Sequence, residues 1–358
     1  MLPNPDGTVA NLVTDRQVRV VPGALARLRT LGDTFAPEAA HRVLGGDADA
    51  RAFVARLEEL SVLVQPDPEL FRGTRIRHAD VEINAHCNAR CRFCPVAADA
   101  LPPRLMPLSV YERVVAALDP LHLDWVSLNH YNEPLLAPDF LDRTEVLARA
   151  GLRLRLFTNG CRLKADVVAR LVRQDVVERI VVNLPSADAG RYRELMGVRM
   201  PPALLDDVAR AAEAGLPVHV CVNGDGRRTP AEAAELRAYF GAREVPVVVY
   251  ANLTHDRAGL LEGPLVRAPG RFTGTPAGCR RVYEHLSVNV EGKVFLCCQD
   301  YRQEHVLGDL LLDTVEAVLA GERAVRFRRQ IFGDLPADRD LICRSCIELN
   351  HVRTGDAG

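Results

Sequence analysis

Three cysteines lie close together after a short alternating stretch of sequence. They are Cys87, Cys91 and Cys94, spaced by four and then three residues. One tight loop with these spacings can turn three thiolates toward one centre, and iron–sulfur clusters are held by cysteine thiolates, normally four of them. A four-iron cluster with only three cysteines keeps one iron free to bind another ligand. Zinc is the alternative, although structural zinc sites are closed by four protein ligands.

A second set of cysteines lies near the C-terminal end. A β-hairpin is predicted around Glu291-Gly292-Lys293, and the cysteines before, at the end of and after it are Cys279, Cys297, Cys343 and Cys346. Four thiolates could hold a second iron–sulfur cluster or a zinc ion. Cys298 adjoins Cys297, so either thiol could be the ligand. The spacing favours Cys297, and the other thiol should then face the opposite side of the strand.

The composition is that of an ordinary globular protein. The chain has 358 residues, is 48% hydrophobic and 26% charged, and carries a formal net charge of −2. This length allows two or three domains. The net charge gives no general indication of nucleic-acid binding. No apolar run is long enough for a membrane span, and the first residues lack a signal pattern. We therefore expect a cytoplasmic protein, in which ten cysteines indicate metal binding or catalysis rather than disulfides.

Strand and helix patterns alternate from about residue 78 to 255, which predicts an α/β fold with parallel strands and right-handed crossovers. The expected strands are Val81–Asn84, Trp125–Asn129, Leu152–Phe157, Ile180–Leu184, Val218–Val222 and Val245–Tyr250. The expected helices are Ser109–Leu118, Pro138–Ala150, Lys164–Gln174, Pro202–Ala214 and Pro230–Tyr239. In barrels of parallel strands, functional groups gather at the C-terminal ends of the strands.

The first cysteine set resembles the motif of the radical S-adenosylmethionine (radical SAM) superfamily, C-x3-C-x2-C with an aromatic residue, here Phe93, before the third cysteine. The resemblance implies a partial (β/α)6 barrel and a [4Fe–4S] cluster whose open iron chelates S-adenosylmethionine. One electron, from an external donor such as flavodoxin or ferredoxin, then gives a 5′-deoxyadenosyl radical. That radical takes a hydrogen atom from a substrate carbon, while the protein binds and aims the reactants.

The resemblance also implies cofactor-binding residues at the strand ends: Phe93, Asn132, Glu133, Asn159, Asn183, Ser186 and Arg199. Glu133-Pro134 matches the end of a Gly-Gly-Glu-Pro run that holds the methionine amino group, but Tyr131 and Asn132 replace both glycines. Simpler roles stay open. Glu133 could be a helix-start acid, Ser186 a helix N-cap, and Arg199 a solvated surface residue.

The second cysteine set resembles the twitch, or SPASM-like, extension of the same superfamily, which implies one auxiliary [4Fe–4S] cluster with four cysteine ligands. Asp256-Arg257-Ala258-Gly259 resembles the run that leads out of the barrel in such enzymes. The first 75 residues resemble the winged-helix PqqD-like units of peptide-modifying members, because a short β-element precedes helical patterns at Ala24–Leu31, Pro37–Leu44 and Asp49–Leu60. Gly and Pro predict a linker at 65–68 and a connector at 260–275. A packing extension is equally open. We expect domains at residues 1–75, 76–258 and 259–358.

The fate of the substrate radical depends on nearby groups. Asp300 and His130 are candidate bases for an oxidation, and Cys298 and Cys161 are candidate hydrogen-atom donors for an epimerisation. Structural roles are the alternative for all four, since free cysteines are often buried like small apolar residues. We expect a natural-product or antibiotic tailoring enzyme that oxidises or epimerises a sugar or aminocyclitol. A ribosomal-peptide maturase is one alternative, and a non-catalytic iron–sulfur or zinc protein that binds a partner is another.

Overall fold

The structure is a computed structural model. It describes residues 2–3, 8–10, 17–19, 24, 27, 37–46, 48–59, 71–224, 227–254, 256–261, 275–276, 278–346 and 351–352. Its largest element is a nine-stranded sheet in the order β13-β12-β11-β4-β5-β6-β7-β8-β9. The strands from β4 to β9 pair in parallel, in agreement with the predicted partial barrel. They are β4 (His78–Val81), β5 (Trp125–Ser127), β6 (Leu154–Thr158), β7 (Val177–Asn183), β8 (Val218–Gly224) and β9 (Val248–Leu253).

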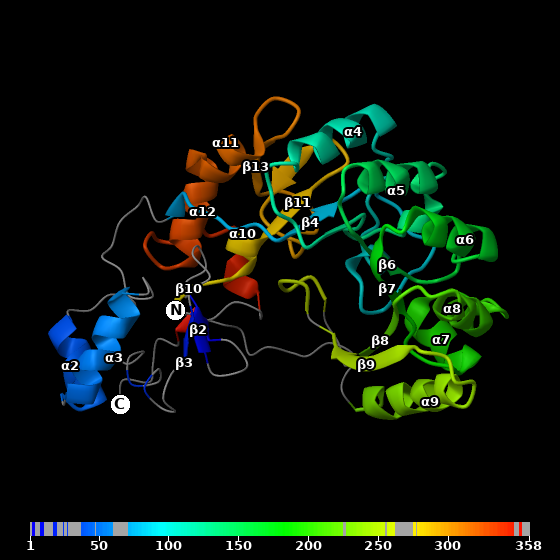
Figure 1. Ribbon diagram of the computed structural model, residues 1–358, viewed down its shortest axis with the longest axis horizontal. Helices are drawn as coiled ribbons and strands as arrows, with labels where there is room; N and C mark the ends of the chain where they lie inside the picture. The colour runs from blue at the N-terminus through cyan, green and yellow to red at the C-terminus, as the bar shows by residue number, and fades with distance from the viewer. Residues whose placement is uncertain are drawn as a thin grey trace.

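Helices connect these strands and cover the outer face of the sheet (Figure 1). They are α4 (Leu108–Ala117), α5 (Phe140–Arg149), α6 (Ala165–Gln174), α7 (Ala189–Met196), α8 (Leu204–Glu213) and α9 (Thr229–Gly241), with 3-10 turns η2 (Pro95–Ala97) and η3 (Pro134–Leu136). Alternate strand residues such as Leu154 and Leu156 are fully buried against these helices. Because side chains alternate along a strand, the residues between them face the inside of the barrel.

The auxiliary region is joined to the barrel through the sheet itself. Strand β11 (His285–Val288) pairs in parallel with β4, and β12 (Lys293–Phe295) and β13 (Val306–Asp309) continue the sheet antiparallel. Three helices and one 3-10 turn complete the region: α10 (Arg281–Glu284), α11 (Val315–Ala320), α12 (Glu322–Ile331) and η4 (Ile342–Ser345). The hairpin followed by helices fits the expected twitch layout. The β11–β4 pairing was not predicted.

The buried guanidinium of Arg328, on α12, joins the auxiliary region to the segment just before the barrel. It donates to the backbone carbonyls of Phe71, Leu319 and Val282 at 2.5, 2.7 and 3.3 Å. Burial lowers the pKa of Arg328 to about 10, so the group stays charged at neutral pH. Carbonyl acceptors thus satisfy a charge that would be costly to bury alone.

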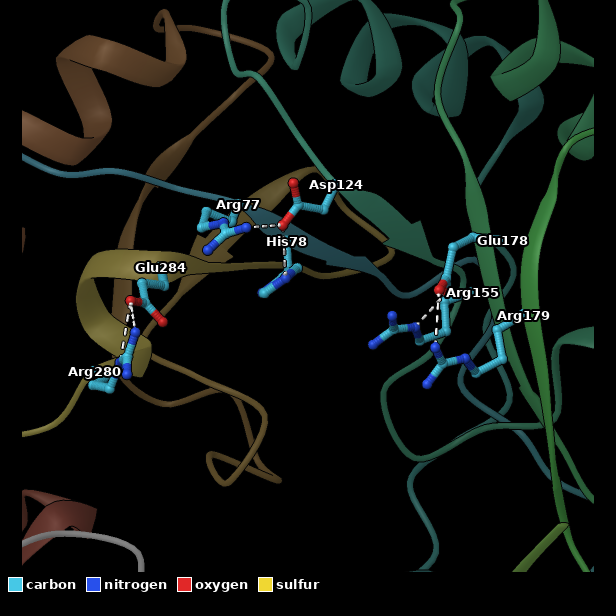
Figure 2. Close-up of polar contacts among 8 residues, drawn as sticks. All are labelled: Arg77, His78, Asp124, Arg155, Glu178, Arg179, Arg280 and Glu284. Carbon is cyan, nitrogen blue, oxygen red and sulfur yellow. Dashed lines mark hydrogen bonds and ion pairs between the residues drawn. The ribbon is translucent and has the colours of Figure 1, made fainter. Parts of the chain in front are cut away.

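The N-terminal end of the barrel strands is lined by ion pairs (Figure 2). Arg77 contacts Asp124 at 2.8 Å, and Arg155 and Arg179 converge on Glu178 at 2.7 and 3.3 Å. His78 also points at Asp124, at 3.5 Å, but burial lowers its pKa to about 4, so this contact is not an ion pair at neutral pH. This end of the barrel is therefore stabilised by charges, on the side opposite to the strand ends that carry the motifs.

A small unit precedes the barrel and lies apart from it in Figure 1. It contains an antiparallel three-stranded sheet, β1 (Leu2–Pro3), β2 (Thr8–Ala10) and β3 (Gln17–Arg19), and the helices α2 (Pro37–Leu44) and α3 (Ala48–Glu59). The predicted helix at 24–31 lies largely outside the described residues, as do the predicted linker at 65–68 and connector at 260–275. A separate two-stranded pair joins β10 (Thr275–Pro276) to β14 (His351–Val352).

Several predicted strand bounds were wrong: β9 covers 248–253 rather than 245–250, and two further errors lie next to the cysteine sets. The first barrel strand covers 78–81 rather than 81–84, because the backbone leaves the sheet there and Asn84 instead bridges to Leu105. The second hairpin strand ends at Phe295, where the register shifts, so Cys297 and Cys298 lie in the following turn. Strand alternation therefore does not decide which of these two thiols faces the auxiliary site.

Candidate functional site

The first cysteine loop follows β4 and is docked on the C-terminal end of α7. The backbone N–H groups of Arg90 and Arg92 donate to the carbonyls of Met196 and Leu195, both at 2.9 Å. Gly197 ends α7 with a positive φ of 70°, and a Cβ atom there would lie 2.6 Å from the carbonyl oxygen of Arg90. Only glycine allows this approach, so the end of α7 fixes the position of the loop.

The three thiols of this loop lie near one another and are largely buried. Burial raises the pKa of Cys87 to about 11 and also raises the pKa values of Cys91 and Cys94, and the neighbouring thiols raise those of Cys87 and Cys91 further. The Ala89 N–H donates to the Cys87 sulfur at 3.4 Å. Three gathered thiols with a backbone donor fit an iron–sulfur cluster, which binds deprotonated cysteines, so that loading must release protons.

The turn after β6 supports the loop from the other side. The side-chain amide of Asn159 donates to Asn88 Oδ1 at 2.7 Å and lies 3.9 Å from the Cys87 sulfur. Glu133 accepts the Asn159 N–H at 2.7 Å and the Thr158 hydroxyl at 2.8 Å. Burial raises the pKa of Glu133 to about 7, against the effect of these donors. The carboxylate thus holds the turn that carries Asn159, and it also accepts the Leu135 N–H at 3.2 Å at the start of η3.

Three of the other candidate cofactor residues lie at a strand end, in the cysteine loop and in the turn after β5. Asn183 lies at the end of β7, where its amide is 3.6 Å from the Met196 sulfur, and Phe93 is buried in the loop. Asn132 shapes its own turn, accepting from His130 N at 2.9 Å and donating to the Leu128 carbonyl at 3.2 Å.

The remaining two candidates lie around α7. Ser186 is buried and accepts the Asp188 N–H at 3.2 Å, while Asp188 itself is the N-cap of α7. Arg199 is exposed, which leaves its predicted role beside a cofactor carboxylate without support from the structure.

The second cysteine set also gathers in the structure. The thiols of Cys343 and Cys346 lie close enough to Cys297 to raise its pKa, after the larger effect of burial, and Cys279 acts on Cys343 in the same way. Cys298 raises the pKa of Cys297 more than the other thiols do, but its own sulfur accepts Arg281 Nη1–H at 3.2 Å. This arrangement agrees with Cys297 as the fourth ligand. Among the described residues, no three Cys, His, Asp or Glu side chains are grouped so as to hold one metal ion.

Two of the candidate catalytic residues lie in different settings. Asp300 is buried and accepts the N–H of His305 at 2.9 Å and of Glu304 at 3.2 Å, and it raises the pKa of His305 through a side-chain hydrogen bond. Its carboxylate therefore holds a turn. Cys161 lies 3.7 Å from the Tyr192 hydroxyl, and its thiol raises the pKa of Cys91 of the first loop.

His130 belongs to a buried polar cluster that joins the barrel to the auxiliary region. Gln303 Nε2 donates to Glu82 Oε2 at 2.8 Å and lies 3.2 Å from His130 Nδ1. Glu82 Oε1 is 3.6 Å from the same nitrogen. His130 Nε2 is buried without a hydrogen-bond partner. Gln303 has a positive φ of 57°, which a non-glycine residue adopts only when its surroundings hold it.

Sequence reasoning missed the part of the site built from Tyr131 and Arg257. Tyr131 packs edge-on against Tyr301 and His130, with ring centroids 5.0 and 4.5 Å apart, and the Arg257 guanidinium lies 5.9 Å from its ring centroid. After burial, the charges that affect the pKa of Tyr131 include Arg257 and the thiols of Cys94 and Cys297. Tyr131 therefore lies close to thiols of both cysteine sets. Tyr131 in place of the expected glycine was a signal in the sequence, but the sequence does not show where the tyrosine side chain points.

Comparison with known proteins gives relatives for both cysteine regions. Two curated relatives match part of the chain: the GTP 3′,8-cyclase of Marinobacter nauticus, 25% identical over 146 residues, and the mycofactocin maturase MftC of Mycobacterium tuberculosis, 23% identical over 164 residues. These matches cover 40% and 45% of this chain but only 43% and 41% of the two relatives. The chain therefore spans less than half of each of them.

Solved structures share the fold. Streptococcus suis SuiB bound to its precursor peptide SuiA gives a TM-score of 0.55 and 15% identity over 86% of this chain and 74% of that one. BtrN in complex with AdoMet and 2-DOIA gives a TM-score of 0.51 and 18% identity over 77% of this chain and 94% of that one. None of the described helices has the length and apolar character that crossing a bilayer requires.

Two family models match the regions that carry the cysteines. The radical SAM superfamily model matches residues 81–236, and the SPASM iron–sulfur cluster-binding domain matches residues 279–347. These domains bind S-adenosylmethionine and [4Fe–4S] clusters, including an auxiliary cluster, which favours iron–sulfur over zinc at both sets. The chain is therefore a radical SAM superfamily enzyme with a C-terminal SPASM-type iron–sulfur domain.

Proposed function

We propose that this enzyme oxidises a C–H position of a peptide substrate, with removal of a hydrogen atom at the first cysteine set and of an electron at the second. The observation that carries the proposal is the position of Tyr131, whose phenol is affected electrostatically by thiols of both sets. A substrate bound beside it would lie between the two. Hydrogen-atom loss followed by loss of a proton and an electron is a net two-electron oxidation.

Individual residues have distinct parts in this proposal. Cys87, Cys91 and Cys94 would hold one cluster, and Cys279, Cys297, Cys343 and Cys346 the other. When bound, the first cluster with S-adenosylmethionine supplies a radical that abstracts hydrogen, and the auxiliary cluster supplies an electron acceptor.

The chain's own residues would position the substrate and accept a proton. Glu133 and Asn159 keep the first loop in place. His130 is our candidate for the proton acceptor, because its Nε2 is buried without a partner while Gln303 lies beside its Nδ1. Asp300 is a weaker candidate, because its carboxylate already holds a turn.

The N-terminal unit supports a peptide as the substrate. Its three-stranded sheet and helices α2 and α3 fit the expected PqqD-like unit. SuiB, whose solved structure holds a bound precursor peptide, resembles this chain in fold over 86% of this chain's length, whereas BtrN does so over 77%. We retain the expected division into residues 1–75, 76–258 and 259–358, an external donor such as flavodoxin or ferredoxin, and a cytoplasmic location as parts of the proposal.

Oxidation or epimerisation of a sugar or aminocyclitol is the second candidate. The fold likeness to BtrN and the single four-cysteine auxiliary set favour it. For an epimerisation, Cys161 is the better placed thiol, because it lies near Cys91 of the first loop. Cys298 is engaged by Arg281.

One assay separates these possibilities. Anaerobically reconstituted protein is reduced with dithionite, given S-adenosylmethionine, and tested for 5′-deoxyadenosine. Peptides and aminocyclitols labelled with deuterium are then compared for transfer of label into 5′-deoxyadenosine. Label from a peptide and a product lighter by two hydrogens support the proposal, whereas solvent deuterium in the product supports epimerisation. A protein that never forms 5′-deoxyadenosine is a non-catalytic iron–sulfur protein, and the proposal fails.

A further inference from the structure

Arg257 lies in a strained turn at the mouth of the barrel, just after β9. Arg257, Ala258 and Gly259 have positive φ angles of 53°, 55° and 85° in succession. Residues other than glycine rarely adopt this conformation, and when they do the surrounding structure must hold them in it. Strain of this kind is concentrated at functional sites, so the side chain of Arg257 is a candidate functional group.

The guanidinium of Arg257 has no anionic partner among the described residues. Its Nε is buried without a hydrogen-bond partner, and its charge instead faces the ring of Tyr131 at 5.9 Å. Arg191 of the barrel, by contrast, is paired with Glu232 at 2.9 Å. Arg257 is half-buried, and a buried N–H that makes no hydrogen bond is unfavourable, so an acceptor at this nitrogen would be stabilising.

Tyr131 adds a second unused donor at the same place. Its hydroxyl is buried without a hydrogen-bond partner. The ring is held on two sides, edge-on against Tyr301 at 5.0 Å and against His130 at 4.5 Å. Buried tyrosine hydroxyls usually have a partner, so this phenol and the guanidinium beside it lack the same kind of group, an acceptor.

The pair lies close to Cys94, the last cysteine of the first loop. Arg257 acts electrostatically on the thiols of Cys94 and Cys221, in each case against the larger effect of burial, which raises their pKa values. Glu133 acts instead on Cys87, at the other end of the loop. The Glu133–Asn159 turn and the Arg257–Tyr131 pair are therefore associated with different thiols of the loop.

We propose that Arg257 and Tyr131 form an anion-binding pair that holds a carboxylate of the substrate between the two cysteine sets. A guanidinium can donate two parallel hydrogen bonds to a carboxylate, and a phenol can donate a third. The enzyme would therefore select substrates with an acidic group near the reacting carbon, such as a peptide with an acidic side chain or a free C-terminus. This inference rests on the proposed function, because it concerns the substrate of that reaction.

Bromide is a suitable probe for the pair, because the substrate is not identified. Crystals of the reconstituted enzyme with S-adenosylmethionine are soaked in bromide, and the anion is located by anomalous scattering. The variants are Arg257→Met, Arg257→Lys and Tyr131→Phe. Arg149→Gln is the matched control, since Arg149 lies on α5 with 65% of its side chain exposed. Iron content tells whether each variant has loaded its clusters.

We expect bromide at Arg257 in the wild type and in Arg149→Gln, none in Arg257→Met, and weaker occupancy in Tyr131→Phe. Acetate should displace the bromide from the wild type more readily than from Arg257→Lys, because lysine lacks the planar fork. The affinity of Arg257→Met for S-adenosylmethionine, from titration of the reduced cluster's electron paramagnetic resonance signal, should stay within about threefold of the wild type.

Two results would overturn the inference. One is the carboxylate of S-adenosylmethionine on Arg257, with a roughly tenfold loss of its affinity in Arg257→Met, which would assign the pair to the cofactor. The other is an adventitious ion only, with bromide on surface arginines but not at Arg257. If the wild type binds bromide at the pair but forms no 5′-deoxyadenosine, the proposed function fails and the anion site stands.

Discussion

Gln303 of the auxiliary region donates its side-chain amide to the carboxylate of Glu82 in the barrel at 2.8 Å. Both side chains are buried, and the contact joins residues that are 221 positions apart in the sequence. Gln303 makes it from a left-handed backbone conformation with a φ of 57°. The two regions of the enzyme are thus connected through a polar contact that also reaches His130.

We expect the loss of this contact to destabilise the folded protein. Gln303→Ala leaves a buried carboxylate without its donor, which should lower the free energy of unfolding by about 1–3 kcal/mol. Gln303→Gly should cost less, because glycine accepts the positive φ. Anaerobic urea unfolding measures both. Arg302→Ala, which removes an exposed ion pair to Asp99, is the control and should cost under about 1 kcal/mol. Equal losses in Gln303→Ala and Arg302→Ala would contradict the assignment.

Gly197→Ala should displace the first cysteine loop. The new Cβ would lie 2.6 Å from the Arg90 carbonyl oxygen in a residue with a φ of 70°, so we expect a loss of about 2–4 kcal/mol of stability. Gly215→Ala is the matched control, because Gly215 has a φ of 88° but nothing within 4 Å of its added Cβ, and should cost about 1 kcal/mol.

The cluster content of the same two variants identifies the part of the protein that is affected. Iron and sulfide analysis should find Gly197→Ala depleted at the first set, with the auxiliary cluster retained. Gly215→Ala should keep both clusters. Equal iron content in the two variants would show that the end of α7 does not control the loop.

Cys297 and Cys298 should differ sharply when each is changed to alanine. Cys297→Ala should lose the auxiliary cluster, because its thiol interacts with those of Cys343 and Cys346. Cys298→Ala should keep it, because its sulfur accepts from Arg281. Iron and sulfide quantitation should give about four irons against about eight. The triple variant of Cys87, Cys91 and Cys94 to alanine should also hold about four, with no 5′-deoxyadenosine. Loss of the auxiliary cluster in Cys298→Ala, with retention in Cys297→Ala, would make Cys298 the ligand instead.

The stability of the protein should fall as the pH falls from about 6.5 to 4, in part because of His78. Burial lowers the pKa of His78 from 6.5 to about 4, so the unfolded chain binds a proton in this range that the folded protein does not. With allowance for solvent, we expect about 1 kcal/mol between pH 7 and pH 5. His78→Gln should have a smaller pH dependence, measured as the urea midpoint at both values. An unchanged slope would mean that other groups carry the effect.

The sequence predicted those features that have a local signal. Helix α2 has the bounds that its apolar pattern indicated, and the alternation of elements gave the parallel barrel. Helix α7 was not predicted, because its sequence is polar and has Gly190 in its first turn. The pairing of β11 with β4 was not predicted either. These residues lie about 200 positions apart and pair through backbone groups, which every sequence has.

The candidate site, like the fold, was predictable only where the sequence carries a local signal. Cysteine spacing identified both thiol sets and suggested Cys297, although the strand argument used beside it does not apply to a turn. Arg199, expected beside the cofactor, is exposed. The arginine whose side chain faces Tyr131 is Arg257, because the sequence does not tell which arginine a strained turn will direct inward.

The ladder between β11 and β4 has a consequence for catalysis. In the proposed reaction, this continuous sheet would hold the site where a substrate is activated and the site where its electron is taken in one rigid element. The distance that an electron must cross would then be set when the chain folds. Substrate length and shape, rather than domain motion, would decide which molecules this enzyme can convert.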